Sequence, residues 1–372
     1  AVKDFDLHTL PVSSTGWCAN PKHKLSPGLQ RVWKNLEVLT SVHGLKLLEW
    51  DGRSPVALLD KKDRVITALG GLPPGSANGD WQSVTSDAAE AMEHCRTVSS
   101  FSNRQLHGRR GEFASRTVGF GYGNGRTKPQ NFKVAGKANQ AAVQELLARK
   151  SICRIAGFQS SLFNVFSHKN YREHVRTNDE LQALQPELRR NFPNTPFAAL
   201  TFNLGPQSWS PPHMDADNYA SSWCADTAVG SFDPDQGGQL ILWDFGLIIR
   251  FPPGATILFP SALVTHSTMP IQSHESRYAI LQYSSGGLFR WRSNNFQSDK
   301  QLLQTASAEQ IHDWRAKRAS VWKVGIQKFT VWEDLCRGDW QGVVRSEAGL
   351  DDLSDLSEFE GTTPVRKRAR RH

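Results

Sequence analysis

The sequence is poor in cysteine, and its cysteines lie far apart. Five of them occur in 372 residues without any Cys-x-x-Cys pair: Cys18, Cys95, Cys153, Cys224 and Cys336. Zinc clusters use closely spaced cysteines and disulfide frameworks use an even number of them, so the sequence predicts neither and suits reduced thiols. Any metal must therefore be bound by histidine and carboxylate side chains.

Long hydrophobic runs are also absent. No segment reaches the roughly 18 consecutive apolar residues that a transmembrane helix needs, so we expect no membrane association. A hydrophobic content of 38% is ordinary for a globular protein, and 372 residues suffice for one large domain or two fused ones. No internal repeat is visible, and we expect a monomer.

Acidic residues are scarce in one part of the chain. From Arg96 to Lys133 the only acid is Glu112, against eight cations: Arg96, Arg104, Arg109, Arg110, Arg116, Arg126, Lys128 and Lys133. The whole chain carries a formal charge of +8, and the segment from Ser346 onward carries −1, which leaves +9 for the rest. A basic block of this density is typical of a surface that binds a polyanion, and a solvated charged surface is the alternative.

Residues 1–134 are predicted to combine helices with extended segments. The pattern predicts a helix over 29–42, an extended pair with a Pro-Gly turn over 55–75, and a helix over 86–101. The region ends in the basic segment "SRTVGFGYGNGRTKPQNF" (115–132), whose glycines and proline predict a loop or a hairpin.

Residues 135–345 are dominated by short apolar segments rich in β-branched and aromatic residues. Helices are predicted over 137–150, 178–192 and 307–329. Between them lie "FAALTFNL", "QLILWDF", "LIIRF", "ATILFP", "ALVTHS" and "RYAILQYS", most of them followed by glycine- or proline-containing turns. Strands this closely spaced indicate an antiparallel sandwich or jelly roll rather than alternating βαβ units.

Residues 346–372 are predicted to form a disordered tail, acidic at first and basic at its end. The segment "VRKRARRH" has five cations in its last seven residues. Such a run is typical of a nuclear import signal or a tether to nucleic acid, and a merely solvated tail is the alternative. We therefore expect a nuclear protein.

The segment "SPPHMDADNY" (210–219) contains a His-x-Asp triplet. In a strand, residues i and i+2 point to the same face, so His213 and Asp215 would offer an imidazole nitrogen and a carboxylate oxygen to one metal ion. His266, in the later segment "ALVTHS", would supply a third ligand. A polar loop for the triplet and a hydrogen-bonded core role for His266 are the alternatives.

Arg277 follows His266 by eleven residues, in the last apolar segment. Two histidines and a carboxylate on one face of Fe(II) leave positions open for a 2-oxo acid and O₂. A buried arginine can then form a bidentate pair with the carboxylate of 2-oxoglutarate, which lysine would not reproduce. Taken alone, Arg277 could be a surface cation. Together, the four residues predict Fe(II) and 2-oxoglutarate chemistry.

From 47 to 292 the chain resembles the TET/JBP family of Fe(II)/2-oxoglutarate dioxygenases, which oxidise methylated bases in DNA. The likeness is nearest to the fungal, mushroom-type, transposon-associated branch, and is carried by "VGFGYGNGRTKPQNF", "PPHMDADNYA", "FPPGATILFPSALVTHS" and "QYSSGGLFRW". It implies an α+β fold with a double-stranded β-helix (jelly roll) core, placed at 135–345, and flanking helices. The chain departs from this pattern in two ways. It lacks the cysteine-rich region that the animal members carry before the barrel, and Ala279 stands where many 2-oxoglutarate enzymes have the serine of an Arg-x-Ser pair.

The resemblance also implies roles for individual residues. His213, Asp215 and His266 would be the iron ligands and Arg277 the co-substrate anchor. Asn218 would contact a flipped base, or else cap a turn as an Asx residue, and Asn203 would contact the co-substrate, or else be structural. The residues expected to contact DNA are Arg126 and Lys128 on phosphates, and Tyr122 or Phe120 stacked beside the flipped base.

These observations predict an enzyme that oxidises the methyl group of a methylated base in double-stranded DNA. The predicted substrate is 5-methylcytosine, converted to 5-hydroxymethylcytosine and further, with N6-methyladenine as a second candidate. Three alternatives stay open: a 2-oxoglutarate dioxygenase acting on RNA or protein, an inactive DNA-binding module of the same fold, and a cupin-like metal enzyme that does not use 2-oxoglutarate.

Overall fold

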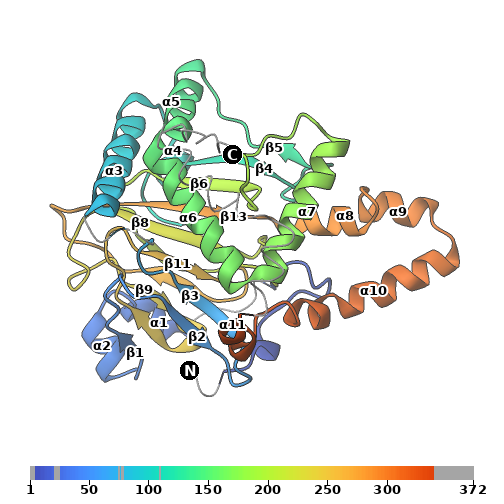
Figure 1. The fold of residues 1–372 in the computed structure, drawn as a ribbon, viewed down its shortest axis with the longest axis horizontal. Coiled ribbons are helices and arrows are strands. Elements are labelled where there is room, and N and C mark those ends of the chain that lie inside the picture. Colours follow the sequence, from blue (N-terminus) through green and yellow to red (C-terminus); the bar gives the residue numbers. More distant parts are fainter. Residues whose placement is uncertain (1–4, 21–25, 74–75, 77–78, 109, 339–372) are drawn as a thin grey trace, which may run out of the picture.

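The computed structural model contains two β-sheets, a layer of helices over the larger sheet, and further helices outside that layer (Figure 1). It describes residues 5–20, 26–73, 76, 79–108 and 110–338. Arg109 of the basic block and the predicted tail at 346–372 lie outside these residues. No helix among the described residues is both long and apolar enough to cross a membrane.

The larger sheet has the strand order β2-β3-β11-β8-β13-β6-β4-β5, and the smaller one the order β1-β10-β9-β12-β7. All their ladders are antiparallel except that of β1 with β10. The strands are β1 (Lys46–Leu48), β2 (Val56–Leu59), β3 (Val65–Leu69), β4 (Ser115–Gly121), β5 (Gln130–Asn131), β6 (Ala199–Asn203), β7 (Ser210–His213), β8 (Cys224–Ser231), β9 (Leu240–Leu242), β10 (Leu247–Ile249), β11 (Thr256–Phe259), β12 (His266–Thr268) and β13 (Ser276–Tyr283).

Most of the predicted strands are confirmed, but two strands, β1 and β8, are missing from the prediction. The sequence of β8, "CADTAVGS", is too rich in small residues to stand out as an apolar run, although Cys224 to Val229 are all buried. The segment "ALVTHS" is mostly a turn, and β12 begins only at His266. The turn of the β2–β3 hairpin lies at 60–64, where Asp60 accepts backbone hydrogen bonds, and not at the Pro-Gly segment that follows β3.

The helices are α1 (Pro27–Val32), α2 (Leu36–Ser41), α3 (Asp80–Val98), α4 (Asn103–Leu106), α5 (Lys137–Ala148), α6 (Lys150–Phe166), α7 (His168–Leu184), α8 (Gly286–Ser293), α9 (Asp299–Thr305), α10 (Ala308–Ile326) and α11 (Trp332–Arg337). Helix α6 packs against β3, β8 and β11 of the larger sheet and contacts α3, α5 and α7 (Figure 1). Helix α6 was not predicted from the sequence. The helix predicted over 178–192 is confirmed only as far as 184, where α7 ends just before Pro186.

The N-terminal strands belong to the same two sheets as the later ones. Strand β4 pairs with β6, β3 pairs with β11, and β1 pairs with β10. The predicted glycine-rich hairpin is confirmed as β4–β5, in which Phe120 faces Asn131 and Gly121 faces Gln130. Residues from both sides of position 134 therefore share one hydrogen-bonded scaffold.

Candidate metal centre

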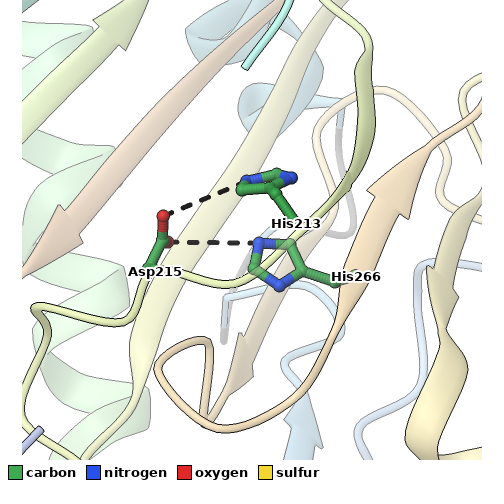
Figure 2. A group of neighbouring side chains, drawn as sticks. All are labelled: His213, Asp215 and His266. Atoms are coloured by element: carbon green, nitrogen blue, oxygen red, sulfur yellow. Dashed lines mark ion pairs between the residues drawn. The ribbon is translucent and has the colours of Figure 1, made fainter. Parts of the chain in front are cut away.

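His213 and His266 face each other in the smaller sheet, where β7 pairs with β12 (Figure 2). Strand β7 ends at His213, so Asp215 lies in the following turn and not in the strand as predicted. The backbone N–H of Asp215 donates to the Ser261 carbonyl at 2.9 Å, which holds the turn against the loop before β12. The predicted convergence of the three side chains thus results from one strand pair and one turn.

The three side chains come close enough to bind one ion. Asp215 Oδ1 lies 3.9 Å from His213 Nε2, and Asp215 Oδ2 lies 4.0 Å from His266 Nε2. One ligand atom from each residue lies within 4.8 Å of the other two. The side chains of Asp215 and His266 are only 7% and 8% exposed, so a bound ion would be largely shielded from solvent.

Both imidazoles are held in one tautomer by the backbone. His213 Nδ1–H donates to the Pro211 carbonyl at 2.8 Å, and His266 Nδ1–H donates to the Val264 carbonyl at 2.9 Å. Each Nε2 atom is thereby left as the lone-pair acceptor that a metal requires. Burial, followed by the nearby His266, lowers the pKa of His213 to about 3 although Asp215 opposes the shift, so the ring is neutral at pH 7.

Arg110 contacts the carboxylate of this group and was missed as an individual site residue. Its Nη2 lies 2.6 Å from Asp215 Oδ1, while its side chain remains 46% exposed. Burial raises the pKa of Asp215, but Arg110 and the two histidines outweigh burial and lower it to about 2. In the sequence Arg110 is one cation among eight, and no spacing relates it to Asp215.

Arg277 lies in the same pocket as the three candidate ligands. It is 2% exposed, and its Nη1 donates to the Ser208 carbonyl at 2.9 Å. Its guanidinium lies 5.7 Å from the ring centroid of Phe232 and 5.5 Å from that of Phe251. Its Nε and Nη2 atoms have no hydrogen-bond partner among the described residues. A buried cation with unpaired donors is suited to a carboxylate ligand.

Asp226 is a second acidic side chain in this pocket, and the sequence reading missed it together with β8. It is 7% exposed, and its Oδ1 has no hydrogen-bond partner among the described residues. Burial raises its pKa to about 6, and Arg277 only partly opposes this. The pocket therefore contains a carboxyl group that titrates close to neutrality.

The two asparagines of the prediction are placed differently. Asn203, at the end of β6, lines the pocket with Arg277, as a co-substrate contact requires. Asn218 is not among the residues that line the pocket. Its side-chain amide donates to Ser261 Oγ at 3.1 Å, and its backbone N–H donates to the Asp215 carbonyl at 2.8 Å. In this structure Asn218 stabilises the turn that carries Asp215. This role is close to the alternative interpretation, in which Asn218 caps a turn.

The residues predicted to contact DNA lie on or beside the β4–β5 hairpin. The guanidinium of Arg126 stacks on Phe132 at 4.9 Å, whereas Lys128 forms an ion pair with Glu187 at 3.5 Å. Tyr122 is only 9% exposed and packs edge-on against Trp291, and Phe120 is fully buried. Neither ring is on the surface, so stacking beside a flipped base would require its displacement from the core.

No family model and no curated protein matches this sequence. Among solved structures, NgTET1 in complex with 5mC DNA is 16% identical over 71% of this chain and 92% of that chain, with a TM-score of 0.44. A 2OG-Fe(II) oxygenase family oxidoreductase from Burkholderia pseudomallei is 15% identical over 46% and 66%, with a TM-score of 0.27. The viral collagen prolyl hydroxylase of Paramecium Bursaria Chlorella virus-1 is 14% identical over 23% and 57%, with a TM-score of 0.19. Since these TM-scores lie below 0.5, function is inferred from the site itself.

Proposed function

We propose that this protein is an Fe(II)- and 2-oxoglutarate-dependent dioxygenase of the TET/JBP type that oxidises the methyl group of a methylated base in DNA. The observation that carries the proposal is the presence of His213, Asp215, His266 and the buried Arg277 around one pocket.

The donor set fits ferrous iron. Two neutral imidazoles and one carboxylate are the ligands of the facial triad that leaves positions open for further ligands on non-haem Fe(II). His213 and His266 present Nε2 because the backbone occupies Nδ1, and Asp215 is ionised because cationic and imidazole neighbours lower its pKa. Bound iron with 2-oxoglutarate and O₂ would supply the oxidant, and these three side chains would hold the iron in place.

Arg277 fits the role of co-substrate anchor. Its two unpaired nitrogens can donate together to one carboxylate, and the rings of Phe232 and Phe251 lie close to the guanidinium. Asn203 lines the same pocket and offers an amide that can donate or accept. Ala279 stands where the second anchoring hydroxyl of many relatives would be, so the hydroxyls of Ser208 and Thr268, which also line the pocket, are candidates for that contact.

The order of strands supports a double-stranded β-helix as the core. Strands β6, β13, β8 and β11 are neighbours in the larger sheet, and β7, β12, β9 and β10 are neighbours in the smaller one. Along the chain, these eight strands pass from one sheet to the other at nearly every connection. In such a fold the two sheets face each other, which would bring Arg277 on β13 and His213 on β7 to opposite walls of one cavity.

DNA is proposed as the substrate because of the basic block and the resemblance described above. The target would be 5-methylcytosine, oxidised to 5-hydroxymethylcytosine and then further, or N6-methyladenine. The base would have to leave the helix to reach a pocket this buried. We also propose nuclear localisation, because of the basic segment at 366–372, and a monomeric state.

The test is succinate release from 2-oxoglutarate by the iron-loaded protein, with methylated duplex DNA, unmethylated duplex, methylated RNA and peptide substrates in parallel. Nucleoside mass spectrometry of the methylated duplex would identify the product. We expect succinate and an oxidised base with methylated DNA, and neither with His213→Ala or Asp215→Ala. Turnover with RNA or peptide alone would overturn the substrate, and no turnover with intact metal binding would favour an inactive DNA-binding module.

A further inference from the structure

A second pocket lies along the edge of the larger sheet, next to the β4–β5 hairpin. Its volume is about 460 Å³, and three cations line it: Arg116, Arg126 and Lys133. The other described residues that line it are neutral, and no carboxylate is among them. We call it the edge pocket.

Arg116 is held in the wall of the edge pocket by its contacts and is not a freely moving surface cation. The residue is 5% exposed, its Nη2 donates to the Ser100 carbonyl at 3.1 Å, and its guanidinium stacks on Phe101 at 4.5 Å. Its Nε has no hydrogen-bond partner, and no ion pair neutralises it among the described residues. A buried cation without a counter-charge is unfavourable unless a ligand supplies one.

The other cations differ in whether their charge is compensated. The guanidinium of Arg126 stacks on Phe132, and its one hydrogen bond to a described residue is a long one, 3.4 Å, to the Gly123 carbonyl. Lys133 is exposed and forms no ion pair with any residue that the structure describes. Lys128, on the same hairpin, is already paired with Glu187 and does not line the pocket. The uncompensated charge therefore lies at the cations that line the pocket and not at Lys128.

The backbone of β4 adds polar groups to the pocket. Strand β5 pairs with β4 only at Phe120 and Gly121, so within the described part of the chain no strand pairs with the outer edge of β4 from Ser115 to Thr117. The Gly119 carbonyl accepts from Phe132 N–H on this edge. Because backbone groups alternate along a strand, the N–H of Thr117 points to the same edge as that carbonyl, toward the pocket.

We propose that the edge pocket binds a backbone phosphate of the DNA strand whose base enters the metal centre. Arginine and lysine side chains with a free backbone N–H are the groups that bind phosphate in proteins. The inference rests on the proposed function for the identity of the polymer. It revises the earlier prediction by assigning the phosphate to Arg116, Arg126 and Lys133 in place of Lys128.

The position of the edge pocket would allow a single DNA strand to reach both the edge pocket and the metal centre. Thr117 lines the edge pocket, and its hydroxyl lies 2.8 Å from the hydroxyl of Thr201. Thr201 lines the metal-centre pocket on the adjacent strand β6. The two pockets are thus separated by one strand pair. A phosphate bound in the edge pocket would hold the DNA strand in place while its base moves into the metal centre.

The test compares Arg126→Gln/Lys133→Gln with Lys128→Gln, all in the full chain without iron. Arg116 is left intact because its substitution would disturb the fold. The affinity for a duplex containing 5-methylcytosine is measured by fluorescence anisotropy over a series of KCl concentrations. We expect the slope of log K against log salt to fall by about one for each cation removed in the double variant. Affinity at low salt should fall about tenfold or more, and Lys128→Gln should keep the wild-type slope.

An unchanged slope in the double variant would overturn the proposal, and so would an equal loss with Lys128→Gln, which would indicate a diffuse surface field. Mn(II) affinity measured by calorimetry should be the same in the double variant and the wild type, since neither residue lines the metal-centre pocket. If the proposed activity is wrong, neither the wild type nor any variant oxidises the base, but the double variant still differs from the wild type in the slope of log K against log salt. The two failures are therefore distinguishable.

Discussion

Arg110 Nη2 lies 2.6 Å from Asp215 Oδ1, so a partly exposed cation contacts the carboxylate of the candidate metal-binding group. A bound metal ion would share this carboxylate with Arg110, and the two positive charges would repel each other. The contact also compensates the buried charge of Asp215 while no ion is bound. Arg110 should therefore weaken metal binding and stabilise the metal-free protein.

Replacing Arg110 by glutamine tests this balance. We expect Arg110→Gln to bind Mn(II) several-fold more tightly in calorimetry and to unfold at lower temperature in the presence of a chelator. Arg104→Gln, an exposed cation in the same basic block, is the matched control and should change neither property. Weaker Mn(II) binding by Arg110→Gln would show instead that Arg110 orients the carboxylate for the metal.

Arg277→Lys keeps the charge in the pocket but loses the fork of donors. A charge-assisted hydrogen bond contributes roughly 1.5–3 kcal/mol, so losing one should raise the apparent KM for 2-oxoglutarate by about ten- to a hundredfold. Mn(II) affinity should stay unchanged because Arg277 is not a ligand. Arg250→Lys, in a partly exposed ion pair with Asp235, is the control for the substitution itself. An unaltered KM would remove Arg277 from the co-substrate site.

The sequence predicted the ligands better than it predicted their neighbours. A His-x-Asp triplet and a later histidine are visible because a metal restricts both residue type and spacing. Arg110 reaches Asp215 across 105 positions through a contact that leaves no pattern in the sequence. Asp226 was missed because β8 is built from small residues, whose burial depends on the helix and strands packed around them. Sequence periodicity reports on a residue's own element, whereas these two contacts are set by tertiary packing.

Asn218 offers a test between its two interpretations. Its amide donates to Ser261 Oγ, and the Ser261 carbonyl accepts from Asp215 N–H, so the three residues stabilise one turn. Asn218→Ala should therefore weaken Mn(II) binding a few-fold in the absence of DNA, and Ser261→Ala should do the same. If Asn218→Ala left metal affinity intact and raised only the KM for methylated DNA, the base-contact interpretation would be favoured.

Asp226 should make stability depend on pH in an unusual direction. Its pKa is raised from an ordinary value of 3.8 to about 6 by burial, so the folded protein holds this proton more tightly than the unfolded chain. Between about pH 4 and pH 6 the folded state then binds more protons, and the free energy of unfolding falls as pH rises. The difference amounts to about 2–3 kcal/mol above pH 6.

Asp226→Asn removes that titration and keeps the shape of the side chain. In urea unfolding of the metal-free protein from pH 4 to pH 7.5, the variant should gain stability relative to the wild type as pH rises, and the gain should level off above pH 6. Asp235→Asn is the opposite control: the hydrogen bond from Arg250 lowers the pKa of this exposed carboxyl, so its replacement should produce no gain at high pH. A constant difference between Asp226→Asn and the wild type across this range would mean that Asp226 stays ionised beside Arg277, held by that charge in spite of its burial.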